Sequence, residues 1–150
     1  MDYPRGHRID RRWLDPSLYP ETHRVQTRFQ DLDTLGHINN VAMAAMFEAA
    51  RVRFNHPMRA EFQTDTVRTM VAGQTLNYVA EAHSRPDLDF HIGVGHIGTS
   101  SWVVQVCAVQ GDTPVLLAMA TMVTTSGGKA CPVPPGLRAM LEARRLRLPS

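Results

Sequence analysis

The segment from Val41 to Asn55 restricts the fold of this chain more than any other feature. It contains neither glycine nor proline and is apolar on nearly every side, while Glu48, Arg51 and Asn55 share one narrow polar stripe at helical spacing. A helix that is apolar nearly all round is normally buried. We therefore expect a long helix enclosed by other elements. It should end before Pro57, because a proline disfavours helical backbone at the residue that precedes it.

Strand patterns surround this helix. Alternating polar and apolar residues predict a half-buried strand over 23–30, and four longer strands are predicted over 69–81, 87–97, 101–109 and 113–125. The last of these is apolar nearly throughout, which indicates burial on both faces. A single antiparallel sheet curled around the helix would satisfy both patterns, so the predicted class is α+β.

The two ends of the chain differ from this middle part. Residues 1–22 are basic, polar and interrupted by prolines, which predicts an N-terminal arm with one turn near Trp13. The ring of Trp13 is expected to hold the arm against the body. The folded domain is predicted to occupy residues 23–150 and to finish with a short amphipathic helix over 137–146.

Composition and charge exclude several classes of protein. The 150 residues are 43% hydrophobic and 20% charged, as in globular proteins, and the formal net charge of +2 predicts no nucleic-acid partner. Two cysteines are too few for a disulfide framework or a four-thiolate zinc site. No apolar stretch is long enough to cross a membrane and no secretory leader is recognisable, so the expected location is the cytoplasm, with no membrane partner.

The most informative motif runs from Thr27 to Asn40 and reads TRFQDLDTLGHINN. Acidic residues precede a Gly-His pair, two asparagines then open the apolar helix, and Glu48 and Arg51 form an E-x-x-R pair further along it. This pattern resembles the signature of hot-dog thioesterases of the 4-hydroxybenzoyl-CoA thioesterase type. It is also similar to the D-x-N-x-H-x-N-N segment of plant acyl-ACP thioesterases.

The resemblance implies a hot-dog fold, in which an antiparallel sheet wraps around one long buried helix. It implies an acyl-CoA thioesterase that needs neither a metal nor another cofactor. An acyl carrier protein thioester is the alternative substrate, and a non-catalytic acyl-CoA-binding protein of the same fold is the alternative function. Because hot-dog domains pair through their sheet edges, the resemblance also implies a homo-oligomer, either a dimer or a tetramer.

Three residues are predicted to carry the catalysis: Asp33, His37 and Asn40. Asp33 falls on the family's catalytic acidic position, where a carboxylate acts as a base or a nucleophile; its alternative role is to cap a turn. The helix that begins near Asn40 offers free N–H groups to a thioester oxyanion. His37 is predicted to donate to the thioester oxygen, to orient Asp33 or to bind pantetheine, unless it only stabilises the turn.

Five further residues are predicted to contact substrate: Asn39, Val41, Glu48, Met43 and Phe47. Capping of the helix is the alternative role for Asn39. Glu48 either pairs with Arg51, within the chain or across an interface, or faces the cleft from a partner subunit. Asp31, which lies two positions before Asp33, is expected to be solvated; the alternative is that its charge raises the pKa of Asp33 by repulsion.

The remaining motifs are interpreted as structural. Gly93 to Gly98 match G-x-G-x-x-G, but a strand pattern rather than a helix follows, which excludes a dinucleotide-binding site. Asp31, Asp33 and His37 are too crowded in sequence for ordinary metal-ligand spacing, so no metal is expected. His83 is assigned to the surface or to the edge of the core.

Overall fold

The computed structural model describes residues 2–6, 8–64 and 66–150, so Met1 and His7 of the expected arm lie outside the described residues. Three short 3-10 helices and two α-helices accompany six strands. In chain order the elements are η1 (Arg11–Leu14), η2 (Pro16–Leu18), β1 (Glu21–Val25), η3 (Phe29–Asp31), α1 (Asn40–Phe62), β2 (Val67–Tyr78), β3 (Leu88–Ile97), β4 (Ser101–Gln110), β5 (Thr113–Ser126), β6 (Lys129–Ala130) and α2 (Pro135–Glu142).

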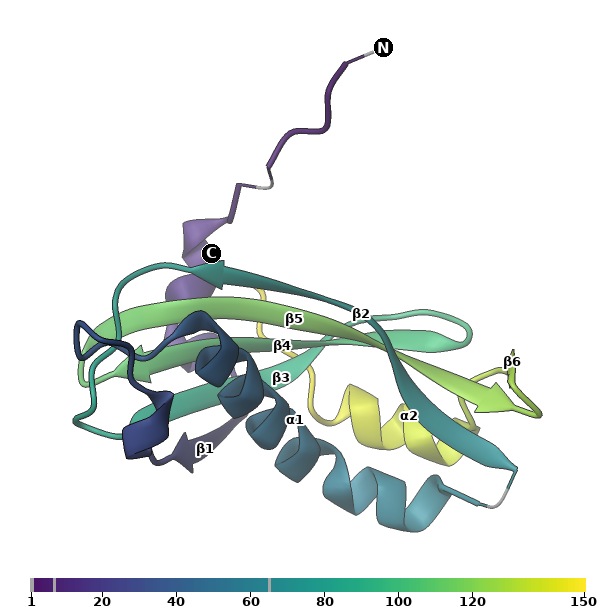
Figure 1. Cartoon of the computed structure of the whole chain (residues 1–150). Coiled ribbons are helices and arrows are strands. Elements are labelled where there is room, and N and C mark those ends of the chain that lie inside the picture. Colours follow the sequence, from purple (N-terminus) through teal and green to yellow (C-terminus); the bar gives the residue numbers. More distant parts are fainter. Residues whose placement is uncertain (1, 7, 65) are drawn as a thin grey trace.

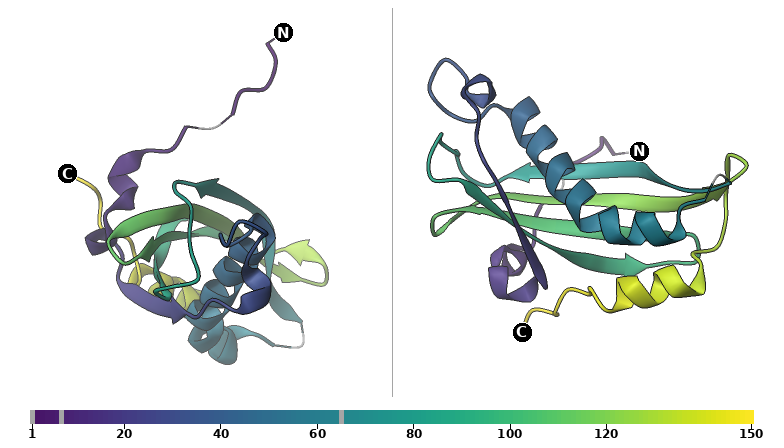
Figure 2. Two further views of the ribbon diagram at one scale, coloured as in Figure 1. Left: turned by 60° about the vertical axis from the view of Figure 1, so that its left-hand side comes forward. Right: turned by 90° about the horizontal axis from the view of Figure 1, so that it is seen from below.

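The strands form one antiparallel sheet in the order β1-β3-β4-β5-β2, with the short β6 beside the end of β5. The sheet curls around α1, which crosses its concave face, and α2 lies next to the C-terminal half of α1 (Figures 1 and 2). This arrangement confirms the predicted α+β class with one sheet wrapped around one long helix.

The main core lies between α1 and the concave face of the sheet. Alternate residues of β3, β4 and β5 point inward, which reproduces the period of two seen in the sequence. They meet a stripe of α1 that includes Met43, Phe47, Ala50 and Phe54, all of them buried. Burial of large apolar side chains on this scale is the main source of stability for the fold.

The N-terminal arm covers part of the opposite face of the sheet. Leu18 and Tyr19 pack against Cys107 and Val109, and together they form a second, smaller apolar cluster. Gly93 permits the close approach of the chain ends, because a Cβ atom at this position would lie 2.6 Å from Pro20 Cδ. Residues 2–6 and 8–10 extend away from the sheet (Figure 1).

Helix α1 departs from the prediction in two ways. It continues through Pro57 to Phe62 rather than ending before the proline. The lost hydrogen bond is offset because the extra turns bury Met58 and place Phe62 directly against Gly136 of α2. The helix is also not enclosed on all sides, since Val41 and Val52 are exposed.

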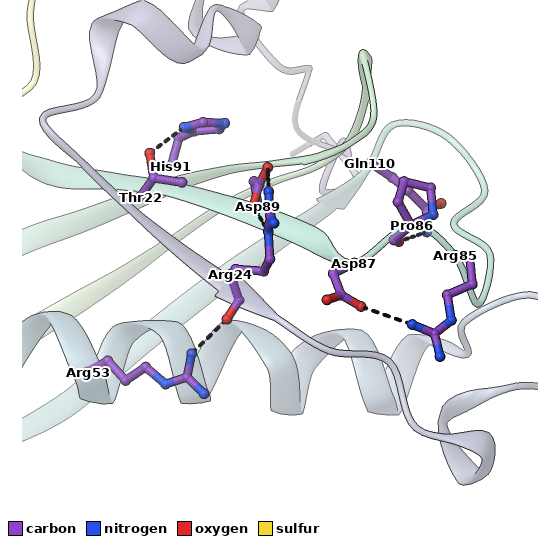
Figure 3. Close-up of polar contacts among 9 residues, drawn as sticks. All are labelled: Thr22, Arg24, Arg53, Arg85, Pro86, Asp87, Asp89, His91 and Gln110. Atoms are coloured by element: carbon purple, nitrogen blue, oxygen red, sulfur yellow. Dashed lines mark hydrogen bonds and ion pairs between the residues drawn. The ribbon is translucent and has the colours of Figure 1, made fainter.

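The first strand is shorter than the sequence predicted. It begins at Glu21 and ends at Val25, after which the chain forms η3 instead of continuing to Gln30. Side chains fasten this strand to its neighbours: Arg24 Nε lies 2.9 Å from Asp89 Oδ1 on β3, and Arg53 Nη1 on α1 donates to Arg24 O at 2.8 Å (Figure 3).

Candidate active site

A tight turn between β1 and α1 organises the candidate site. The N–H of Asp33 donates to His37 O at 2.7 Å, and the N–H of Gly36 donates to Asp33 O at 3.1 Å. Gly36 adopts a φ of 81°, a left-handed conformation that glycine reaches without a steric penalty. This turn brings the side chain of Asp33 back over the chain that leads into α1.

The carboxylate of Asp33 is held by one of its two oxygens. Oδ1 accepts the N–H of Leu35 at 2.8 Å and the N–H of His37 at 3.0 Å. Oδ2 accepts no hydrogen bond from any residue that the structure describes. The N–H of His37, assisted by that of Leu35, holds the pKa of Asp33 below its ordinary value. Asp33 is therefore ionised at neutral pH and presents one free oxygen to solvent.

The start of α1 places unpaired donors beside this turn. Asn39 is the N-cap: its Oδ1 accepts the N–H of Ala42 at 2.8 Å, and its own N–H donates to Asp31 O at 2.9 Å. Asn39 thus has the capping role that was the alternative to its predicted contact with substrate, and it does not line the cleft described below. Among the described residues, the N–H groups of Asn40 and Val41 have no acceptor, as expected for the first turn of a helix.

An open cleft brings all three predicted catalytic residues together. Asp33, His37, Asn40 and Met43 line it from one side, and the end of β2 with the following loop closes the other side. Its volume of about 420 Å³ is in the range of small-molecule sites. The helix start, the free carboxylate oxygen and an imidazole thus border one space.

Other predicted residues lie elsewhere. Phe47 is completely buried in the main core, so we assign it to packing rather than to the surface of the cleft. Val41 is 81% exposed and, like Glu48, does not line the cleft of its own chain. Any substrate contact by Val41 or Glu48 would have to lie outside this cleft.

Asp31 is buried, which corrects the expectation that it is solvated. Its side chain accepts the N–H of Arg28 at 2.7 Å and the guanidinium of Arg28 at 3.1 Å. Burial by itself raises the pKa of Asp31, but the hydrogen bonds and charge of Arg28 outweigh it and bring the pKa below its ordinary value. Asp31 therefore stabilises the entry to the site instead of acting on the charge of Asp33.

The loop over residues 79–87 contributes groups that the sequence did not indicate. Glu81 lines the cleft, and its Oε2 lies 3.3 Å from His37 Nε2. The ring of His83 packs edge-on against the ring of His37, with centroids 5.0 Å apart. His83 is exposed, as its assignment to the surface or core edge predicted, but its contact with His37 was not predicted, because no local pattern signals a contact between distant segments.

The buried side chain of Gln110 anchors this loop. Its Oε1 accepts the N–H of His83 at 2.8 Å, while its Nε2 donates to His83 O at 2.7 Å and to Pro86 O at 2.8 Å. Figure 3 shows Gln110 reaching from the end of β4 toward Pro86. One amide thus satisfies three main-chain groups and holds the wall of the cleft in place.

Neither a metal cluster nor a membrane span is present in residues 2–6, 8–64 and 66–150. No three His, Cys, Asp or Glu side chains in these ranges are grouped so that they could hold a metal ion. No helix there is long and apolar enough to cross a membrane.

Comparison with protein families gives a match over most of the chain. Residues 27–141 match the model of the thioesterase-like superfamily. The uncharacterised protein YsmA of Bacillus subtilis is 27% identical over 79 residues, which cover 53% of this chain and 54% of YsmA. The chain therefore spans only about half the length of this curated relative in the alignment.

Solved structures share the fold over nearly their whole length. A predicted thioesterase from Bacillus stearothermophilus has a TM-score of 0.77 and 21% identity, with 85% of this chain and 97% of that one covered. A thioesterase from Thermus thermophilus complexed with coenzyme A and Zn has a TM-score of 0.73 and 23% identity, with 84% and 95% covered. These similarities confirm the predicted hot-dog fold.

Proposed function

The chain belongs to the thioesterase-like superfamily, and on this premise we propose that it hydrolyses an acyl-CoA thioester to a free acid and coenzyme A. The observation that carries the proposal is that one cleft is lined by Asp33, whose Oδ2 accepts no hydrogen bond from the described residues, and by Asn40, whose N–H has no acceptor among them. Thioester hydrolysis needs these two elements, a base or nucleophile and donors for the developing oxyanion. The coenzyme A complex of the Thermus relative supports a CoA thioester as the substrate.

Two routes use this geometry. In the first, Asp33 Oδ2 takes a proton from water while the water oxygen bonds to the thioester carbon. The N–H group of Asn40 binds the oxyanion, which then collapses and expels the CoA thiolate, and the thiolate takes the proton back from Asp33. In the second, Oδ2 itself attacks the carbon and displaces the thiolate, and water hydrolyses the resulting anhydride. Met43 and Asn40 contact the acyl or pantetheine part in either route.

Asp33→Asn tests this assignment. The amide oxygen of asparagine can still accept the N–H groups of Leu35 and His37, so the turn should be retained. The free carboxylate oxygen is lost, and we expect kcat to fall by at least ~10²-fold. Thiol release from acyl-CoA substrates of different chain length measures the effect and identifies the preferred acyl group.

Asp31→Asn is the matched control, since it makes the same chemical change two residues earlier. It weakens the contacts with Arg28, so we expect the free energy of unfolding to fall by about 1–2 kcal/mol. Turnover per folded molecule should not change. Near-normal turnover by Asp33→Asn would contradict the catalytic role of Asp33.

We further propose that two copies pair through β2. This strand lies at the edge of the sheet, is twelve residues long and exposes Met70, Val71 and Tyr78. A long, exposed, apolar edge strand favours pairing with another chain. The end of β2 also borders the candidate cleft, so a second copy on this edge would lie next to the site.

Arg51 supports the same pairing. It is 7% exposed, its guanidinium lies over the ring of Phe47, and its polar contact is a long one of 3.5 Å to Gln74 Oε1 on β2. Burial lowers the pKa of Arg51, while the nearby charge of Glu48 opposes this shift. A buried cation is costly without a carboxylate partner. We propose that Glu48 of the second copy supplies that partner.

A further inference from the structure

The contact between His37 and Glu81 distinguishes the two nitrogens of the catalytic imidazole. Nε2 of His37 lies 3.3 Å from Glu81 Oε2. Nδ1 makes no hydrogen bond to any residue that the structure describes. Since the tautomer of a neutral imidazole is set by the partner of one ring nitrogen, a carboxylate at Nε2 favours the proton on Nε2 and leaves Nδ1 as an acceptor.

The main chain fixes both residues of this pair. The N–H of Ile38, next to His37, donates to Ala82 O at 2.8 Å, and His37 and His83 form an antiparallel bridge. On the other side of Glu81, the N–H of Val79 donates to Val115 O at 2.9 Å. Glu81 is therefore held opposite His37 by the backbone, although its own side chain is largely exposed.

The groups around the imidazole agree with this assignment. His37 is faced by the carboxylate of Glu81, by the edge-on ring of His83 and, within its own turn, by Asp33. Asp33 Oδ1 is occupied by main-chain N–H groups, so the carboxylate of Glu81 is the one whose contact with a ring nitrogen the structure records. An exposed pair of this kind adds little stability, and its effect is on orientation.

We propose that Glu81 is a positioning residue that holds His37 in the Nε2–H tautomer, so that Nδ1 is left as a hydrogen-bond acceptor for the attacking water. This inference rests on the proposed hydrolysis and changes the role of His37 within it. An unprotonated Nδ1 has no hydrogen to donate to the thioester oxygen. The oxyanion is then left to the N–H groups at the start of α1, while His37 orients the nucleophile.

Two variants of Glu81 separate the effect of an oxygen near His37 Nε2 from that of a side chain that merely fills the space. Glu81→Ala removes the acceptor, and we expect kcat to fall by ~10-fold with little change in KM. A loss of this size is at the lower end of those seen when a carboxylate that orients a functional histidine is removed. Glu81→Gln keeps a carbonyl oxygen at the same place, so kcat should return most of the way to wild type. Glu61→Ala is the matched control, because Glu61 is an exposed glutamate at the far end of α1.

A spectroscopic measurement makes the test independent of catalysis. In protein labelled with nitrogen-15 at histidine, the ring signals of His37 should show the Nε2–H tautomer in wild type and in Glu81→Gln, and a mixture of tautomers in Glu81→Ala. If the ring signals and kcat of Glu81→Ala both match wild type, the inference is wrong. If the tautomer changes as expected while Asp33→Asn remains fully active, the proposed role of Asp33 fails and the positioning by Glu81 stands.

Discussion

Gln110 offers the sharpest test of how the fold supports the cleft. Its side-chain amide, 8% exposed, makes three hydrogen bonds to the main chain of His83 and Pro86. Gln110→Leu keeps the size of the side chain but leaves one N–H and two C=O groups of the loop without their partners. Each net hydrogen bond is worth about 1 kcal/mol, and a stranded buried group costs somewhat more. We therefore expect the free energy of unfolding to fall by about 2–4 kcal/mol.

A second buried glutamine on the same strand is a natural control. Gln105 donates from Nε2 to Tyr19 Oη at 3.0 Å, on the face of the sheet covered by the N-terminal arm. The hydroxyl of Tyr19 keeps its bond to Trp13 O, so Gln105→Leu loses one hydrogen bond and should cost about 1 kcal/mol. Both variants replace glutamine by leucine on β4, but of the two glutamines only Gln110 contacts the loop that carries Glu81.

Urea denaturation and steady-state kinetics together measure the outcome. Gln110→Leu should lose several-fold in kcat per folded molecule as well as stability, because residues 79–82 of the loop that it anchors line one wall of the cleft. Gln105→Leu should lose stability with kcat unchanged. Equal losses of stability in the two variants, or full turnover in Gln110→Leu, would refute the view that this amide holds the site in place.

Two further predictions concern the edge strand β2 and the face of the sheet that the N-terminal arm covers. Light scattering should give at least twice the mass of one chain, and replacing Met70 and Val71 on β2 by lysine should yield a monomer; a monomeric wild type would contradict pairing through this strand. Burial raises the pKa of Cys107 to about 12, so this thiol stays protonated and unreactive at pH 8, whereas Cys131 is partly exposed. A thiol reagent such as DTNB should therefore titrate one thiol per native chain and two after denaturation, and two rapidly reacting thiols in the native protein would show that the arm does not cover Cys107.

The sequence predicted the elements and their arrangement well where the signal is local and periodic. Alternation over 87–97 and 101–109 gave strands that agree with β3 and β4 to within a residue. The apolar segment after Asn40 became α1, and a short turn at Gly111 joins β4 to β5. These features depend on the period of side-chain burial, which is readable from a single chain.

Where tertiary packing outweighs local preference, the prediction was wrong. Pro57 does not end α1, because burial of Met58 and the contact of Phe62 with Gly136 favour further helical turns. Asp31 is buried because the chain leaves the extended strand and forms η3, which brings Arg28 into contact with it. Neither outcome follows from propensity, since each depends on atoms that meet only after the chain has folded.

The residues of the candidate site also fall into two groups, those that the sequence could bring together and those that only tertiary packing brings together. Asp33, His37 and Asn40 are close in sequence and belong to one motif, so the sequence by itself could bring them together. Glu81, His83 and Gln110 reach the same place from the end of β2 and the end of β4, through the antiparallel pairing of the sheet. The contact of His37 Nε2 with a carboxylate was therefore decided only by the tertiary structure, because contacts between side chains depend on proximity in space and not along the chain.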